Sequence, residues 1–193
     1  MTLIKSISGI RGTLGGNVGE NLTPIDVVKY AAAYGAWILS AKKGKKVVVG
    51  RDARISGPMV HELVVNTLIA LGIDVVDAGL STTPTVEMAV VEEKAAGGII
   101  LTASHNPKQW NALKLLNHKG EFISAADGAM VLELAESNNI AFAGVDQLGS
   151  ITKKDFLPMH IQKILDLPLV KRDIIAAQKF KIAVDAVNSV GGI

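Results

Sequence analysis

The sequence predicts an α/β protein: a three-layer α/β/α arrangement around a mostly parallel mixed sheet of about four strands, one of them antiparallel. Three short apolar runs, at residues 45–50, 73–77 and 99–101, alternate with longer segments of helical periodicity. Short connections in this β-α-β-α-β order are typical of a parallel sheet with helices on both faces. The composition agrees, since 49% of the 193 residues are hydrophobic and only 4% are aromatic, enough for one domain core.

The predicted helices begin and end at recognisable signals. Thr23 can cap the first helix, and Pro24 suits its first turn. The Ser56 hydroxyl can cap the second helix, which Gly72 ends. Apolar residues at helical spacing extend each segment. The predicted helices cover residues 23–44, 56–72, 81–94, 125–137 and 156–165.

The segment after the third strand breaks the parallel pattern. Residues 113–116 and 121–123 are apolar runs on either side of a turn-like segment, residues 117–120. We therefore expect a hairpin-like excursion with at least one antiparallel strand. Residues 141–150 are expected to form a surface linker.

The end of the chain repeats the pattern of its first predicted strand. Residues 179–185 resemble residues 45–52, because both are basic-flanked apolar runs that lead to an aspartate. A strand without its following helix cannot complete a βα unit. We therefore assign residues 1–150 to one domain, 151–178 to a helical exit segment and 179–193 to the first strand of a truncated second domain. The chain is then expected to be a fragment of a longer protein.

The composition excludes several classes of function. With no cysteine, the chain has no disulfide, no cysteine-ligated zinc and no thiol nucleophile. The formal charge of +2 is too small to attract nucleic acid, and the basic run at residues 42–46 fits a solvated helix end. No stretch approaches the ~20 apolar residues of a membrane span, and residues 1–5 lack a signal-peptide layout. We therefore expect a cytoplasmic protein with no nucleic-acid or membrane partner.

Polar segments follow the predicted strands. Ligands of parallel sheets gather beyond the carboxyl ends of strands, which brings residues 51–54, 78–83 and 102–111 to one crevice. The most informative string is Thr-Ala-Ser-His-Asn-Pro at residues 102–107, where a strand presents Ser104 and Asn-Pro favours a tight turn. Alone, it is most simply a polar turn without chemistry. A hydrolase triad is a poor alternative, because neighbouring serine and histidine rarely adopt its geometry.

That string, with Lys114 ten residues after Ser104, resembles the active-serine loop of the α-D-phosphohexomutases, the phosphoglucomutase and phosphomannomutase superfamily. Further motifs match in the family's order: Ser8–Gly12, Gly50–Ser56 and Thr83–Thr85. The resemblance covers essentially the whole chain. It implies that the full-length protein interconverts hexose 1-phosphate and 6-phosphate through a phosphoserine and a bisphosphorylated sugar. A phosphoglucosamine mutase and a non-catalytic sugar-phosphate-binding domain stay open as alternatives.

The resemblance also implies catalytic roles. Ser104 would carry the phosphate, and its roughly −1.5 to −2 charges need nearby cations. Arg11, in flexible glycine-containing backbone, offers a planar fork for phosphate oxygens. Lys114 can also move a proton as the general acid or base.

Other residues have roles that the sequence leaves less defined. His105, Asn106 and Arg51 are expected to bind phosphate or substrate. Two alternatives stay open: packing of His105 in the turn, and a structural ion-pair cluster of Arg51 with Asp52 and Arg54.

The resemblance implies Mg²⁺ as the cofactor, with Ser104 as its one ligand in this chain and further ligands in later domains. The expected partners are a hexose phosphate and the remaining domains of the same polypeptide, so this chain alone should have little or no mutase activity. Ala112 stands where the family commonly has glycine, and a positive φ there would strain it. His61, His118 and His160 are placed on helix or turn surfaces without partner ligands.

Overall fold

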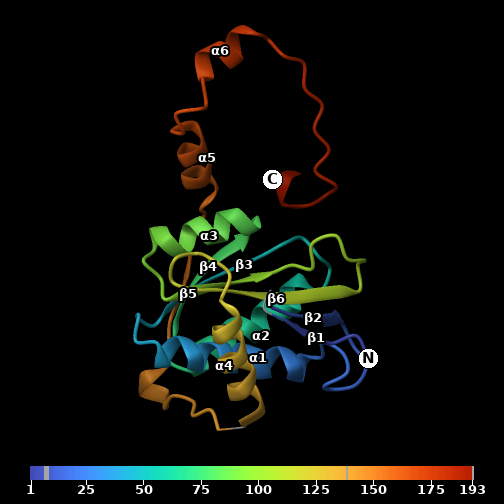
Figure 1. Cartoon of the computed structure of the whole chain (residues 1–193), viewed down its shortest axis with the longest axis vertical. Helices are drawn as coiled ribbons and strands as arrows, with labels where there is room; N and C mark the ends of the chain where they lie inside the picture. Colours follow the sequence, from blue (N-terminus) through green and yellow to red (C-terminus); the bar gives the residue numbers. More distant parts are fainter. Residues whose placement is uncertain (7–8, 138, 193) are drawn as a thin grey trace.

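The computed structural model describes residues 1–6, 9–137 and 139–192. The strands are β1 (Ile4–Ser6), β2 (Gly9–Thr13), β3 (Lys46–Arg51), β4 (Asp74–Leu80), β5 (Gly97–Leu101), β6 (Trp110–Leu116) and β7 (Ile151–Lys153). The helices are α1 (Pro24–Ser40), α2 (Gly57–Ala70), α3 (Thr83–Glu92), α4 (Ala125–Ser137), α5 (Leu157–Leu165) and α6 (Arg172–Ala177). Helices α1, α2 and α4 cover one face of the sheet and α3 covers the other, which confirms the three-layer prediction (Figure 1).

The sheet is larger and more mixed than the sequence predicted. Its seven strands run in the order β1-β2-β6-β5-β3-β4-β7, so the prediction of about four strands is wrong. The pairings β1–β2, β2–β6 and β6–β5 are antiparallel, whereas β5–β3, β3–β4 and β4–β7 are parallel. Strands β1 and β7 have three residues each, too few to show a period, and two glycines weaken the pattern of β2.

The predicted hairpin-like excursion is confirmed: β6 runs antiparallel to β5, and an antiparallel bridge between Leu116 and Phe122 follows the turn. One predicted strand does not form: residues 179–185 have no strand, and all of them are exposed. No described strand lies beside them to pair with their backbone, and an unpaired strand has no ladder to hold it. The division of the chain into 1–150, 151–178 and 179–193 stays a prediction.

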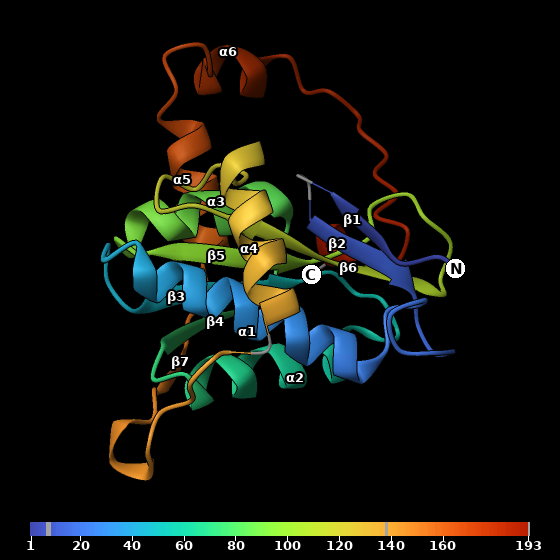
Figure 2. The ribbon, with the colours of Figure 1, turned by 60° about the horizontal axis from the view of Figure 1, so that its bottom comes forward.

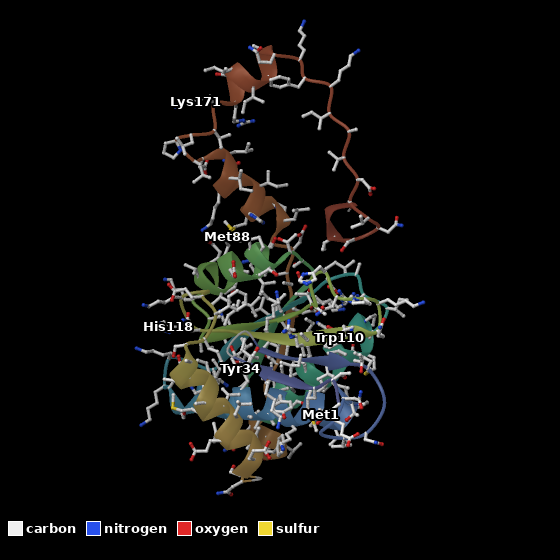
Figure 3. The ribbon with its side chains drawn as sticks, turned by 45° about the vertical axis from the view of Figure 1, so that its right-hand side comes forward. Met1, Tyr34, Met88, Trp110, His118 and Lys171 are labelled. Carbon is white, nitrogen blue, oxygen red and sulfur yellow. The ribbon has the colours of Figure 1, made fainter. Side chains whose placement is uncertain are left out.

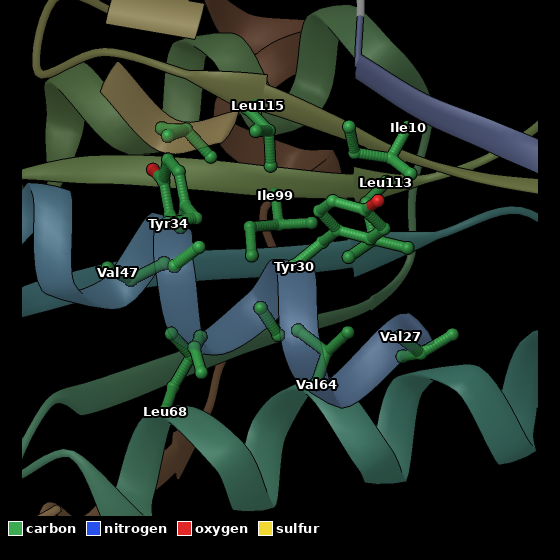
Figure 4. Packing of buried hydrophobic residues seen from close by; sticks show 14 of the residues in the cluster. Ile10, Val27, Tyr30, Tyr34, Val47, Val64, Leu68, Ile99, Leu113 and Leu115 are labelled. Carbon is green, nitrogen blue, oxygen red and sulfur yellow. The ribbon is translucent and has the colours of Figure 1, made fainter. Parts of the chain in front are cut away.

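Two apolar layers hold the sheet rigid. The larger lies between the sheet and α1, α2 and α4, and Tyr30, Tyr34, Ile99 and Leu113 are part of it (Figure 4). The smaller lies under α3. The buried Tyr34 hydroxyl donates to the carbonyl of Leu116 (2.8 Å), and burial raises the pKa of Tyr34. The hydroxyl therefore stays protonated and joins α1 to the strands that carry the site.

The helix starts agree with the predicted signals at two of three positions. Thr23 and Asp26 form a reciprocal capping box at α1, and the Thr82 hydroxyl accepts from the amide of Thr85 (3.3 Å) at α3. Ser56 precedes α2 but makes no side-chain cap, so that prediction is wrong. Its hydroxyl instead accepts a hydrogen bond from the Asn111 side chain (2.9 Å). The hydroxyl therefore contacts β6 rather than the helix that follows it.

Beyond Phe156 the chain leaves the core. Phe156 is 1% exposed and packs in the layer under α3. Just before it, Lys154 donates to Glu93 (2.6 Å). After it, α5 and α6 extend away from the sheet, as the position of Lys171 shows in Figure 3. The helix predicted at residues 156–165 is confirmed as α5. No helix in the described ranges is long and apolar enough to cross a membrane.

Candidate active site

The segment that links β5 to β6, residues 102–109, is named the serine loop. It leaves the sheet at the carboxyl end of β5, and the amide of Asn106 donates to the carbonyl of Ala103 (3.0 Å) to close a tight turn. Ser104 is exposed at this turn and has a left-handed backbone, with φ of 54°. Such a backbone costs a non-glycine residue roughly 1–2 kcal/mol. Contacts outside Ser104 must therefore hold the loop in place.

Arg54 supplies those contacts. Its guanidinium donates to four carbonyl oxygens, those of Ser104 (2.7 Å), Asn106 (2.8 Å), Pro107 (2.9 Å) and Trp110 (3.1 Å). Asp52 fixes the arginine in turn, since its carboxylate lies 3.2 Å from Arg54 Nε. The structural alternative is therefore correct for Asp52 and Arg54: this guanidinium binds the backbone of the serine loop.

Asn111 anchors the far end of the loop. The side chain is fully buried, its amide donates to Ser56, and its Oδ1 accepts from the amide of Ala112 (2.8 Å). Ala112 lies within β6 and does not have a positive φ. The strain expected for alanine at this position is therefore absent.

Arg11 and Lys114 lie on the same face of the sheet. Ile10 and Leu113 pair with each other and point into the larger core, so alternation turns Arg11 and Lys114 to the opposite face. Arg11 pairs with Ala112, two residues from Lys114. Diagonal neighbours of this kind lie roughly 7–8 Å apart. Arg11 belongs to β2, so the flexible backbone predicted around it is not found.

Helix α3 leaves this part of the face open. It packs on β3 and β5, while β2 and β1 lie to its side (Figures 1 and 2). Lys114 is half-buried, and its Nζ lies 5.8 Å from the centre of the Phe122 ring. Burial raises the pKa of Glu87 on α3, and the charge of Lys114 opposes that rise. Among the described residues no carboxylate lies within 4.0 Å of Lys114 Nζ, so its charge is available to a ligand.

The other predicted binding residues divide between two places. His105 is exposed, with Nδ1 3.5 Å from the Ser104 hydroxyl, and Asn106 is half-buried in the same turn. Arg51 lies apart from them, because it points to the side of the sheet that α2 covers. A Cβ added to Gly57, the first residue of α2, would meet Arg51 Nη1 at 3.3 Å. The structure therefore does not bring Arg51 to the face of Arg11 and Lys114.

The described residues do not build a metal centre. No group of three or more histidine, cysteine or acidic side chains among them is arranged to hold a metal ion. Mg²⁺ prefers several oxygen ligands. Ser104 supplies one hydroxyl oxygen and does not make such a site by itself. Ser8, the first residue of the motif that contains Arg11, lies outside the described residues.

One histidine was misplaced by the sequence analysis. His61 is not on the surface: it is 8% exposed, and its Nε2 lies 2.9 Å from Asp77 Oδ1. The available signal was its spacing, since it precedes buried Val64 by three residues and Val65 by four. Arg54 and Asn111 belong to the polar segments 51–54 and 102–111, but the sequence does not show which side chains of those segments contact the serine loop.

Known proteins resemble this chain throughout. The family described as "Phosphoglucomutase/phosphomannomutase, alpha/beta/alpha domain I" matches residues 4–140. A phosphoglucomutase/phosphomannomutase of Thermococcus kodakarensis is 33% identical over 189 residues, 94% of this chain and 40% of that protein. A phosphoglucosamine/phosphogalactosamine mutase of Sulfurisphaera tokodaii is 29% identical over 190 residues, 96% of this chain and 39% of that protein.

A solved structure of a family protein also resembles this chain. The crystal structure of a phosphoglucomutase/phosphomannomutase family protein from Burkholderia thailandensis matches with a TM-score of 0.70 and 25% identity. The match covers 85% of this chain and 36% of that one. The chain therefore spans about 40% of the length of the curated relatives that it matches.

Proposed function

Since this chain belongs to the phosphoglucomutase/phosphomannomutase family, we propose that the full-length protein interconverts hexose 1-phosphate and hexose 6-phosphate through a phosphoserine at Ser104. One observation carries the proposal. An exposed serine is held in a strained backbone by the four hydrogen bonds of Arg54, next to a sheet face with two cations. Such strain at a fixed, exposed nucleophile is typical of a functional site.

The chemistry follows from the charges. A free hydroxyl of the sugar phosphate attacks the phosphorus on Ser104, the bond from phosphorus to the serine oxygen breaks, and a bisphosphorylated sugar forms. Lys114 moves the proton between that hydroxyl and the departing serine oxygen, so that Ser104 leaves as a neutral hydroxyl, and the reverse transfer returns the proton. Arg11 stabilises the negative charge on the phosphoryl oxygens. After the sugar turns round, Ser104 accepts the other phosphate.

Magnesium would supply further charge neutralisation at the phosphate on Ser104. Because the described residues offer no cluster of metal ligands, the remaining ligands would have to come from elsewhere in a longer protein. The roles of Ser104, Arg11 and Lys114 do not depend on where those ligands lie.

The test uses the longer protein that contains this chain. Intact-mass analysis should find one phosphoryl group, peptide mapping should locate it at Ser104, and added hexose phosphate should remove it. Ser104→Ala should abolish both the phosphate and mutase turnover, whereas Ser137→Ala, at an exposed helix end, should change neither. Full turnover by Ser104→Ala would refute the mechanism. The isolated 193 residues should show little or no mutase activity.

The longer protein also distinguishes the mutase proposal from two alternatives, a phosphoglucosamine mutase and a non-catalytic binding domain. Relatives of this chain include a phosphoglucosamine/phosphogalactosamine mutase. Competition between glucose, mannose and glucosamine phosphates for the longer protein identifies the preferred hexose. A non-catalytic sugar-phosphate-binding domain would bind these compounds without ever carrying phosphate on Ser104.

A further inference from the structure

A second cleft lies away from the serine loop. It has a volume of about 620 Å³ and is lined by the ends of β3 and β4, the first turns of α2 and α3, the chain that leads from β7 to α5, and Val190. None of residues 102–111 lines it. Arg51, which was expected to bind phosphate beside Ser104, lines this cleft instead. The cleft is therefore separate from the serine loop.

A buried histidine–aspartate pair forms one wall. His61 Nε2 lies 2.9 Å from Asp77 Oδ1, and the same oxygen accepts from the amide of Gly79 (2.8 Å). Burial raises the pKa of Asp77, but these hydrogen bonds outweigh it and hold the pKa below its usual range. Asp77 is thus ionised, and it fixes the imidazole with Nε2 as the donor.

The other ring nitrogen of His61 reaches the cleft. Among the described residues, no buried side-chain nitrogen or oxygen lacks a hydrogen-bond partner. Among the described residues Nδ1 of His61 has no hydrogen-bond partner, so it contacts solvent, and the residue lines the cleft. Nδ1 can therefore form a hydrogen bond with a bound ligand.

The cleft also holds two cations that form no ion pair within 4.0 Å among the described residues, although the charge of Lys153 helps to lower the pKa of Asp77. Among the described residues, Arg51 donates only to the carbonyl of Asp52, and no carboxylate lies within 4.0 Å of Lys153. Other charged side chains of the cleft have hydrogen-bond partners or lie at its edge. Lys154 donates to Glu93 (2.6 Å), the Asp155 carboxylate accepts from the amide of Leu157 (2.9 Å), and Glu62 lies at the rim on α2.

Arg51 also stands where a cation is unfavourable. Its Nη1 lies 3.3 Å from the point that a Cβ on Gly57, the first residue of α2, would occupy, and the first turn of that helix has no acidic residue. The positive end of a helix dipole repels a cation and attracts an anion. A bound anion would relieve this repulsion.

We propose that this cleft binds a phosphate group through Arg51 and Lys153, with His61, oriented by Asp77, as a hydrogen-bond partner. Arginine and lysine are the usual phosphate partners, and the cleft is large enough for a phosphomonoester rather than the free ion alone. The site is separate from Ser104. Its test therefore stands or falls without the mutase proposal.

The experiment titrates this 193-residue chain with inorganic phosphate, and in parallel with glucose 6-phosphate, at constant ionic strength set with chloride. The readout is the ¹⁵N resonance of His61 Nδ1, assigned with His61→Gln. Phosphate should move this resonance saturably. Arg51→Gln should weaken binding roughly tenfold and Lys153→Gln about threefold, which are the effects of one half-buried and one exposed charge-assisted bond.

Lys119→Gln is the matched control, because it removes one exposed positive charge at a position outside the cleft and should leave binding unchanged. Lys153 is exposed on β7, so its variant tests the site even if Arg51→Gln fails to fold. Binding of either compound at His61 supports the proposal, and stronger binding of glucose 6-phosphate identifies a phosphomonoester site. No saturable shift, or equal losses for Lys153→Gln and Lys119→Gln, would overturn it.

Discussion

At the scale of single residues, Arg54 does more for the site than the residues with expected chemical roles. Ser104 needs a strained backbone, and one guanidinium holds four carbonyls of the surrounding loop. A planar group with five fixed donors can satisfy four acceptors that lie in different directions. The position of the serine thus depends on a residue that never needs to touch the substrate.

We predict that Arg54→Lys loosens the serine loop. Lysine has three donors on one nitrogen, so it cannot reach carbonyls spread from Ser104 to Trp110, and the free energy of unfolding should fall by roughly 2–3 kcal/mol. Hydrogen exchange at the amides of Asn106 and Trp110 should become faster. Arg172→Lys, on exposed α6, should change neither quantity. Unchanged exchange in Arg54→Lys would mean that another contact holds the loop.

The sequence could identify the serine loop but not all of its supports. The string around Ser104 is continuous, so its position after a strand follows from local pattern. Arg51 and Arg54 are three residues apart, and the sequence does not show on which side of the sheet each side chain falls. The structure sends Arg54 to the serine loop and Arg51 to α2. His61 was missed for the same reason, since its partner Asp77 lies on a strand that is distant in sequence.

At the scale of elements, the sheet depends on close approach between β5 and its neighbours. Gly97 is the first residue of β5, and a Cβ there would lie 2.2 Å from the Tyr34 hydroxyl oxygen and 2.6 Å from the carbonyl oxygen of Leu116. Helix α1 can therefore pack directly on the sheet only where a side chain is missing. The short strands β1, β2 and β7 could not be predicted, because their pairing partners, rather than their own sequences, make them strands.

We predict that Gly97→Ala destabilises the whole domain. The added methyl group would force apart α1 and β5, and overpacking of a well-filled core typically costs about 1–3 kcal/mol. Urea denaturation, followed by circular dichroism, measures this loss. Gly144→Ala is the matched control, since nothing lies within 4 Å of its Cβ, and it should leave the midpoint unchanged. Equal midpoints for the two variants would show that α1 adjusts freely.

At the scale of the whole molecule, the chain has a packed part and an unpacked part. Residues up to Phe156 supply the two apolar layers. Beyond it, large apolar residues are open to solvent, among them Ile161, Ile174 and Phe180. The sequence predicted a strand at residues 179–185 from its likeness to residues 45–52, but a strand forms only where a neighbour pairs with it. The apolar run at residues 45–50 has neighbours on both sides and forms β3, whereas the similar run at residues 179–185 has no neighbour among the described strands and forms none.

The boundary between the two parts can be tested by shortening the chain. A chain that ends at Asp166 keeps Phe156 and α5, so its thermal midpoint should equal that of the 193 residues, and removal of exposed apolar side chains should reduce its self-association. Phe156→Ala in this shortened chain should lower the free energy of unfolding by about 3–5 kcal/mol, the usual effect of emptying a buried aromatic site. Phe180→Ala in the full chain is the matched control, because Phe180 is 66% exposed and its loss should cost little. A large drop in midpoint on removal of residues 167–193 would instead show that the exit segment supports the domain. If the domain is independent of that segment, the geometry of the serine loop is built entirely within residues 1–166, and later parts of a longer protein would supply the remaining magnesium ligands and bring the substrate to it.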